Sequence, residues 1–270
     1  MHYGIEVVPF GHFGTPQTMV TFAQAAEESG WEGIWVWDHI LFPYGVGDPW
    51  VILSAVAAST KTLKIITGVS PLPRYPLHVL SRMLTSLDIL SEGRVIFGTG
   101  LGIDHEFSQF GGVGNATIRA AMLDEGLDIL PKLWSGTPVT HEGTYYTVKN
   151  VTLVPTPVQD HIPIWIGGES KNALRRAAKW DGWIIGTINE TCEVIRPPKM
   201  LEQEILYIKK HRKSNQPFDI AIDGVSDPDN TDIVTQYEKA GATWWFESIF
   251  GLRGSIKEMV TRIKAGPPTK

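Results

Sequence analysis

The chain is poor in cysteine, lacks long apolar runs and has no surplus of positive charge. Its one cysteine, Cys192, excludes an internal disulfide and a cysteine cage for a metal, so we interpret it as a buried structural thiol. No apolar run approaches the roughly 20 residues of a membrane-spanning helix. Residues 1–10 lack the charged start and cleavage site of a signal peptide. We therefore expect a cytoplasmic protein that does not enter a membrane.

Charge and missing motifs narrow the range of partners. Lysine and arginine number 24 against 29 acidic residues, a net charge of -5, which removes the broad basic surface that nucleic acids require. The HxH, HExxH and paired-acid patterns of metal hydrolases do not occur, so no metal site is predicted. The chain is 43% hydrophobic and 20% charged, as expected of a globular protein. We expect its partner to be a small-molecule substrate.

The stretch 63–102 is the clearest structural unit. It begins with an apolar, β-branched run at 63–67, passes through a Gly/Pro loop, continues with helix-period apolar residues over 79–90 and ends with a second apolar run at 95–99. Near-continuous apolar strands are typical of a parallel sheet that is covered on both faces. Both strands end in glycine-bearing loops, where a ligand can approach the backbone.

Similar units recur along the chain. The first strands are predicted to start near residues 3, 33, 63 and 94, a period of about 30 residues, the size of one strand–helix unit. Further strands are predicted at 162–166, 182–185, 218–223 and 243–247. Helices are predicted near 15–29, 50–59, 79–90, 119–134, 171–179, 198–213, 231–240 and 255–265. The alternation predicts one (β/α)8 TIM barrel domain over 1–270, with an open, doubly wound sheet as the alternative.

Two segments interrupt the period. Residues 103–118 read as a long glycine-containing loop, and loops of that length in compact domains are usually functional. Residues 135–153 contain two turn signals around short alternating runs, which predicts a β-hairpin outside the barrel.

Asp38 and His39 follow the second predicted strand, where side chains reach the mouth of a barrel. Histidine titrates near neutrality and can exchange protons with a bound ring, and a neighbouring carboxylate can orient it. A loop cap beside an ordinary, hydrogen-bonded histidine explains the same two residues equally well. Both interpretations stay open on the sequence alone.

Gly167, Gly168, Glu169 and Ser170 lie between the fifth strand and its helix. Free backbone N–H groups at the start of a helix suit a phosphate, although a short turn also needs glycine for steric reasons. The glycines at 98, 100 and 102 alternate with other residues and no helix follows directly, so they do not form a dinucleotide fingerprint.

Glu106 and Asp104, after the fourth strand, are candidates to act on a substrate, although most such loop acids are simply solvated. Arg74 lies in a stiff, proline-rich segment and offers an anion contact. An ordinary surface arginine is the interpretation that we favour for Arg74.

The chain resembles the bacterial luciferase-like family of flavin-dependent oxidoreductases, and in particular its branch that uses the 5-deazaflavin coenzyme F420. The resemblance is carried by seven segments that together span nearly the whole chain. They are GIWVWDH (33–39), ITGVSPLP (66–73), LDILSEGRV (87–95), LDEGL (123–127), IPIWIGG (162–168), AKWDG (178–182) and AGATWW (240–245).

The resemblance implies a TIM barrel that binds FMN or F420 at the carboxyl ends of its strands, and either hydride transfer or oxygen activation on a small organic substrate. It implies that Asp38 and His39 face the cofactor ring and that Gly68, Val69 and Ser70 back it, with a cis peptide bond between Gly68 and Val69. The turn at 167–170 would receive the cofactor phosphate. Glu106 falls where deazaflavin-dependent dehydrogenases of the family place an acid.

Further alternatives follow from the same residues. A flavin-binding protein without turnover would share the fold, and a TIM-barrel lyase or aldolase would need a lysine at a strand end, which is not seen in the predicted strands. A flavin reductase that supplies reduced cofactor and a homodimeric assembly are further expectations from the resemblance.

Overall fold

The apolar runs form a closed barrel of parallel strands in a computed structural model that describes residues 1–268. Eight barrel strands lie within these residues, in the order β3-β2-β1-β11-β10-β9-β8-β5, and pairing of β3 with β5 closes the ring. Their bounds are β1 His2–Val7, β2 Gly33–Val36, β3 Lys64–Thr67, β5 Val95–Gly100, β8 Ile164–Gly167, β9 Gly182–Ile185, β10 Asp219–Gly224 and β11 Trp244–Ile249. The expected (β/α)8 architecture is confirmed, and the open sheet is excluded.

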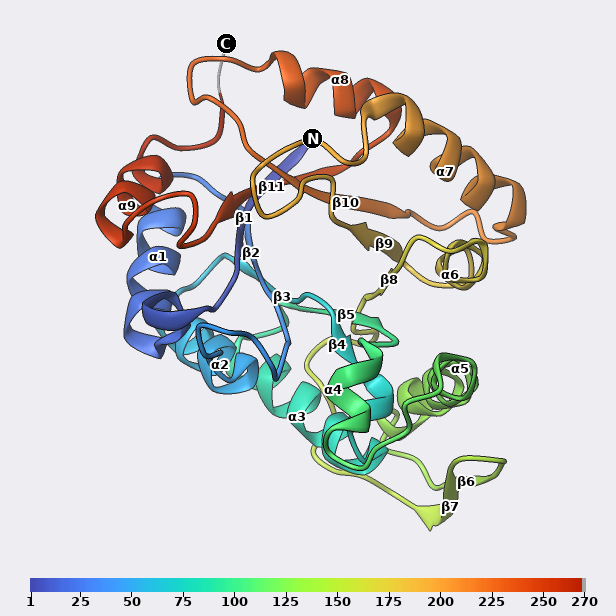
Figure 1. Cartoon of the computed structure of the whole chain (residues 1–270). Helices are drawn as coiled ribbons and strands as arrows, with labels where there is room; N and C mark the ends of the chain where they lie inside the picture. Colours follow the sequence, from blue (N-terminus) through green and yellow to red (C-terminus); the bar gives the residue numbers. More distant parts are fainter. Residues whose placement is uncertain (269–270) are drawn as a thin grey trace.

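Helices surround the strands (Figure 1). They are α1 Pro16–Glu28, α2 Pro49–Ser59, α3 Leu77–Leu90, α5 Ala116–Leu133, α6 Lys171–Ala177, α7 Pro198–His211, α8 Asp232–Ala240 and α9 Ile256–Lys264. Local sequence determines where several helices begin. At the start of α1, the Thr15 side chain accepts a hydrogen bond from Thr18 N, and Pro16 is the first helical residue. At the start of α9, Ser255 forms a capping box with Glu258.

Two apolar layers hold the barrel together. Alternation along the strands sends one set of side chains into the barrel and the other toward the helices. The inner set is dominated by large rings and branched chains: Trp35, Ile66, Ile96, Trp165, Ile184, Ala221, Trp244 and Phe246. Because this set fills the barrel, the space for chemistry lies at the carboxyl ends of the strands.

The segment 103–118 is partly helical rather than a continuous loop. Asp104–Ser108 forms the short helix α4, and α5 begins at Ala116. Such a one-turn helix has too few residues to show a periodic pattern. Short pieces also flank the barrel: the 3₁₀ helices Gly11–Gly14 and Leu72–Arg74, and the two-residue strand β4, Ser70–Pro71, which pairs with β5.

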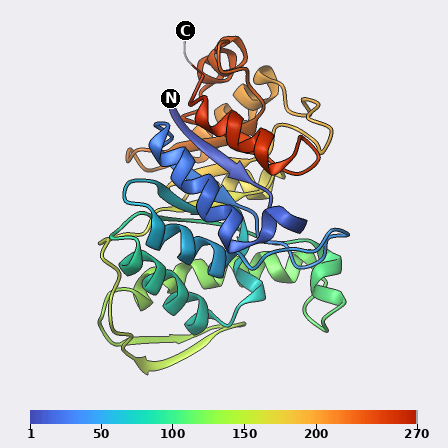
Figure 2. The ribbon, with the colours of Figure 1, turned by 90° about the vertical axis from the view of Figure 1, so that its left-hand side faces the viewer.

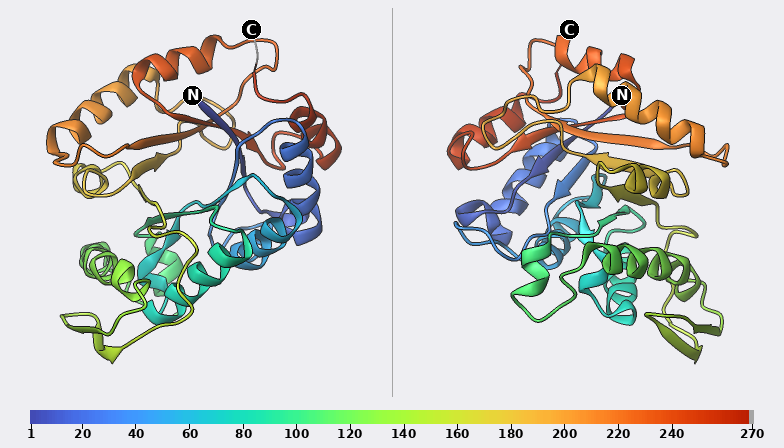
Figure 3. Two further views of the ribbon diagram at one scale, coloured as in Figure 1. Left: turned by 180° about the vertical axis from the view of Figure 1, so that it is seen from behind. Right: turned by 45° about the vertical axis from the view of Figure 1, so that its right-hand side comes forward.

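The hairpin expected at 135–153 is present as β6 Val139–Glu142 and β7 Thr147–Val151, an antiparallel pair outside the barrel. It projects beyond the ring of helices in Figure 2 and in both views of Figure 3. The Glu125 carboxylate of α5 holds its turn by accepting from the backbone N–H of Tyr145 and Tyr146. Within residues 1–268, none of the helices combines the length and apolarity needed to cross a membrane.

Candidate active site

Three neighbouring loops meet at the carboxyl end of the barrel. β2 pairs with β3 and β3 pairs with β5, so the segments that follow these strands lie side by side. Each contributes a charged side chain: Asp38 after β2, Arg74 after β3 and Glu106 in α4 after β5. The expectation that Arg74 is a surface residue is wrong, because its side chain is only 13% exposed and lies between the two carboxylates.

Asp38 is tied to the loop after β3. Arg74 Nη1 donates to its Oδ1 at 2.6 Å, and the Tyr75 hydroxyl donates to its Oδ2 at 2.7 Å. Burial raises the pKa of Asp38, and the Arg74 guanidinium and the Tyr75 hydroxyl partly oppose that shift. Asp38 therefore anchors Arg74 rather than orienting the adjacent imidazole.

Glu106 is the carboxylate that contacts His39. Its Oε1 lies 3.1 Å from His39 Nδ1 and accepts from Ile40 N at 2.8 Å and Leu41 N at 3.1 Å, while Arg74 Nη2 lies 2.5 Å from Oε2. Burial alone would raise the pKa of Glu106, but the two backbone donors, with His39 and Arg74, outweigh it and leave the pKa lowered. Glu106 is therefore an ionised acceptor.

This acceptor determines the tautomer of His39. An ionised carboxylate only accepts hydrogen bonds, so we assign the proton of the neutral imidazole to Nδ1 and the lone pair to Nε2. A histidine oriented by a carboxylate in this way can take a proton from a substrate oxygen or return one to it. The site can therefore transfer a proton to or from a bound substrate.

Gly68, Val69 and Ser70 form the edge of the mouth beside β5. The bond between Gly68 and Val69 is cis, as expected, and the Gly68 carbonyl accepts from Trp35 Nε1 at 2.7 Å. The buried Ser70 hydroxyl faces the Asp38 carboxylate and helps to oppose the rise that burial causes in the pKa of Asp38.

The turn at 167–170 leads into α6. Gly168 has φ +112°, a conformation that side chains rarely adopt, and its carbonyl accepts from Trp183 Nε1 at 2.9 Å. Ser170 caps the helix by accepting from Ala173 N at 3.2 Å. Glu169 points elsewhere, since its Oε2 accepts from Arg196 Nη2 at 2.7 Å.

A second pair of acids lies inside the barrel, and our sequence interpretation missed both. Glu6 of β1 accepts from Trp37 Nε1, and Asp223 of β10 accepts from Thr187 N. Burial, reinforced by the charge of Asp223, raises the pKa of Glu6 to about 8, and burial raises the pKa of Asp223 to about 6. In the sequence, each of these residues could have been noticed as an acid within an otherwise apolar strand.

The strand ends beside Val69 are closely packed. Gly98, Gly100 and Gly167 lie at the ends of β5 and β8 and present backbone where other residues would present side chains. A Cβ on Gly98 would come within 2.0 Å of the Thr67 carbonyl, and one on Gly167 within 2.7 Å of Val69 Cγ1. These positions are glycine because the Thr67 backbone and the Val69 side chain already occupy the space that a side chain would take.

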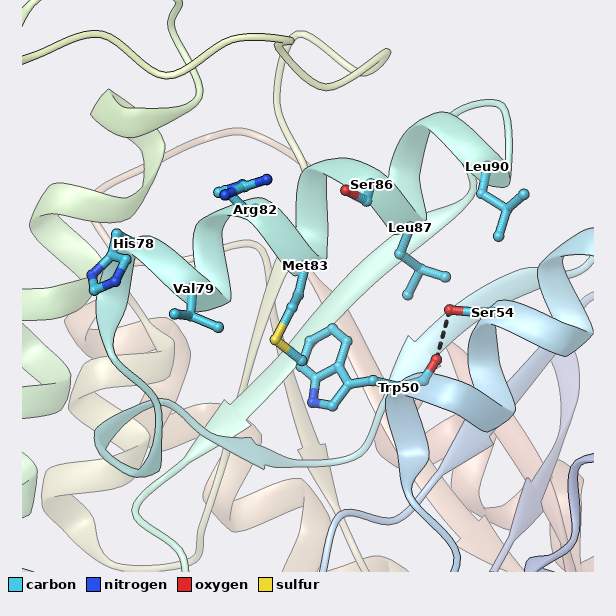
Figure 4. A pocket seen from close by; sticks show the side chains of 9 residues that line it. All are labelled: Trp50, Ser54, His78, Val79, Arg82, Met83, Ser86, Leu87 and Leu90. Carbon is cyan, nitrogen blue, oxygen red and sulfur yellow. Dashed lines mark hydrogen bonds between the residues drawn. The ribbon is translucent and has the colours of Figure 1, made fainter.

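A wider groove than the one at the barrel mouth lies on the outer face between α2 and α3. It has a volume of about 550 Å³ and is lined by Trp50 and Ser54 of α2 and by seven residues of α3 (Figure 4). In Figure 4 the Met83 side chain extends toward the Trp50 ring across this groove. Its lining includes neither a carboxylate nor His39, so we place the chemistry at the carboxyl end of the barrel instead.

A parallel barrel with a carboxylate-oriented histidine at its carboxyl end defines the class: a TIM barrel with a proton-transfer group at the ends of its strands. Residues 5–196 match the family described as luciferase-like monooxygenases. The chain therefore belongs to the luciferase-like family.

Individual relatives carry further names. The chain is 33% identical over 172 residues to the F420-dependent glucose-6-phosphate dehydrogenase of Microbacterium testaceum, covering 61% of this chain and 50% of that protein. It is 32% identical over 174 residues to the F420-dependent hydroxymycolic acid dehydrogenase of Mycobacterium tuberculosis, covering 62% and 48%. The chain thus spans about half the length of these relatives.

Solved structures share the fold over the whole chain. The coenzyme F420-dependent tetrahydromethanopterin reductase from Methanopyrus kandleri has a TM-score of 0.79 at 18% identity and covers 98% of this chain and 96% of its own. An F420-dependent secondary alcohol dehydrogenase in complex with an F420–acetone adduct has a TM-score of 0.80 at 17% identity, with coverage of 99% and 98%. At such identities the likeness shows the fold.

Proposed function

We propose that the protein is an oxidoreductase that binds F420 or FMN at the carboxyl end of its barrel and acts on a small organic substrate. The observation that carries this proposal is the network in which Arg74 and Glu106 hold His39 at the barrel mouth. The coenzyme supplies two-electron hydride exchange when it is bound. The protein then has to position the substrate and handle its proton.

His39 is the proton-handling residue in this proposal. Its Nε2 takes the proton of a substrate hydroxyl when a C–O group is oxidised, and gives a proton back when a carbonyl is reduced. Glu106 stabilises the imidazolium that forms, and Arg74 keeps Glu106 ionised. Asp38 has a positioning role through Arg74 and Tyr75, and no step requires its own titration.

The proposed coenzyme contacts lie around the mouth of the barrel. Gly68, Val69 and Ser70 would back the ring, and the turn at 167–170 would hold the phosphate through backbone N–H groups, with Lys171 adding a positive charge. Glu169 accepts from Arg196, so its contribution would come from its backbone.

F420 is the coenzyme that we favour. Support comes from relatives above 30% identity that are named F420-dependent dehydrogenases. FMN, with reduced FMN activating oxygen, is the second candidate, and the family description favours it. A flavin reductase would be a partner only in the FMN case. A homodimer, which light scattering tests, and a cytoplasmic location are further predictions.

Turnover distinguishes this function from a binding protein without activity. The protein is incubated with reduced F420 or reduced FMN and a panel of aldehydes and ketones, and the reoxidation of the coenzyme is followed by absorbance without oxygen and with it. Acceptor-dependent reoxidation without oxygen indicates hydride transfer, and oxygen-dependent product formation indicates a monooxygenase. Tight coenzyme binding with neither reaction would favour the non-catalytic alternative.

A further inference from the structure

A shallow pocket adjoins the Glu106 network. It has a volume of about 290 Å³ and is lined by Ile40, Leu41, Phe42, Pro43, His105 and Gln109. Ile40 and Leu41 also donate their backbone N–H groups to Glu106. The pocket therefore shares its wall with the group that orients His39, and most of that wall is apolar.

Aromatic rings enclose the imidazole itself. The Phe42 ring meets His39 edge-on at 5.1 Å between centroids and stacks on Phe10 at 4.0 Å. The Trp37 ring lies 5.5 Å from His39, and its Nε1 donates to Glu6, which fixes the indole. A molecule that reaches His39 from this side meets apolar surface.

The loops after the barrel strands are acidic and provide no free guanidinium. In the described part of the chain they carry three arginines, and each is engaged by carboxylates: Arg74 by Asp38 and Glu106, Arg196 by Glu169 and Glu204, and Arg253 by Glu247. The same loops carry nine carboxylates and no lysine. The acids are Asp38, Asp48, Asp104, Glu106, Glu169, Glu190, Glu193, Asp227 and Asp229.

A phosphorylated substrate needs what these loops lack. Binding a phosphate dianion requires cations or several aligned donors, and like charges nearby oppose it. Lys171, the first residue of α6, adjoins the turn at 167–170, on the opposite side of β5 from the loop that carries the pocket residues 40–43. Lys171 thus suits the coenzyme phosphate, and the residues that line the pocket include no lysine or arginine.

We propose that the pocket at Ile40–Pro43, His105 and Gln109 binds the apolar body of an uncharged substrate, and that sugar phosphates and other anions are rejected. This inference rests on the proposed function for its chemistry and adds the substrate class. The oxygen-bearing carbon of the substrate lies toward His39, and its hydrocarbon part covers Phe42. His105 and Gln109 offer hydrogen bonds at the pocket edge.

Three probes of similar ring size separate charge from polarity: cyclohexanol, glucose and glucose 6-phosphate. Each is titrated by saturation-transfer NMR against the protein alone and against the protein saturated with whichever coenzyme binds. We expect cyclohexanol to bind more tightly than glucose, and glucose 6-phosphate not to bind. Phe42→Ala should weaken cyclohexanol binding about fivefold to tenfold through lost aromatic contact. Leu252→Ala, at an exposed apolar position after β11 that does not line this pocket, should leave it unchanged.

Gln109→Lys gives a second variant at the exposed end of α4, and it should gain measurable affinity for glucose 6-phosphate. The inference is overturned if the parent binds glucose 6-phosphate more tightly than cyclohexanol, or if folded Phe42→Ala binds cyclohexanol like the parent. Because probe binding is also measured without coenzyme, failure of both coenzymes to bind would refute the proposed function and still leave this result decisive.

Discussion

Arg74 Nη2 lies 2.5 Å from Glu106 Oε2, which joins the loop after β3 to the short helix after β5. The other arm of the same guanidinium holds Asp38 at 2.6 Å. A planar fork with donors on both arms can contact two carboxylates at once, which an ammonium group on a flexible stem does less well. Arg74 is thus a positioning residue for the whole site, because it fixes the acid that orients His39.

Arg74→Met should destabilise the fold, because it leaves two buried carboxylates without their cation. Breaking a buried ion pair from one side typically costs about 3–5 kcal/mol, and we expect a loss of that order at neutral pH by urea denaturation. Arg175→Met provides the control, since Arg175 is exposed, forms no salt bridge among the described residues and should change stability by under about 0.5 kcal/mol. Equal stability of the two variants would show that the network contributes little.

The burial of Arg74 illustrates a limit of prediction from the sequence. Its partners Asp38 and Glu106 are 36 and 32 residues away, and a proline-rich segment alone does not reveal them. A combined argument was available: the three residues follow three consecutive strands, and consecutive strands of a barrel are neighbours. Placing each charge at the same strand end would have brought them together.

His39→Asn should lower turnover while leaving coenzyme affinity nearly unchanged. Asparagine keeps hydrogen bonding but cannot titrate, and general acid–base catalysis is typically worth about 10²–10⁴-fold. Steady-state kcat is compared with the coenzyme dissociation constant for the same variant. If coenzyme affinity falls more than kcat, the histidine orients the ring; if neither changes in His39→Asn and His39→Ala, it is structural.

Glu6→Gln should stabilise the protein at alkaline pH. The pKa of Glu6 is raised to about 8 in the fold, above its unfolded value near 4.3, so the folded state binds more protons between these values. Its contribution to stability therefore falls as pH rises through that window. Glutamine imitates the protonated acid and can still accept from Trp37.

The measurement is the thermal midpoint at about pH 5 and about pH 8. We expect Glu6→Gln to match the parent at the lower pH and to exceed it by several degrees at the higher one. Glu202→Gln, at an exposed site on α7, is the matched control and should follow the parent at both. A variant that is less stable than the parent at both values would contradict this account of Glu6.

The strands themselves were predictable, because their apolar runs recur at about 30 residues and the barrel needs that alternation. Glu6 and Asp223 were hidden by the same pattern, since each lies in an apolar strand and its charge reads as a minor interruption. Side chains alternate along each strand between the barrel interior and the helices. Assigning Glu6 and Asp223 to the interior face, which also carries Trp35 and Phe246, would have identified them as acids inside the barrel. The helix α4 could not be predicted from the sequence, because five residues are too few to show a helical period in their apolar positions.

Ser170→Asp should weaken coenzyme binding while the protein stays folded. Aspartate still caps α6, but its negative charge lies where the coenzyme phosphate is proposed to sit. Gly168→Val is less informative, because φ +112° strains any side chain and could disturb the turn itself. Thr15→Asp makes the same change at the N-cap of α1 and should bind coenzyme like the parent. Equal affinity in Ser170→Asp and Thr15→Asp would place the phosphate elsewhere.

A parallel fluorescence titration with F420 and FMN tests the central claim most directly. The protein is titrated with each coenzyme under the same conditions, and the dissociation constants are compared. The account predicts saturable binding of one coenzyme, with F420 preferred over FMN and the affinity reduced in Ser170→Asp. Absence of saturable binding for both F420 and FMN by the folded protein would contradict the account.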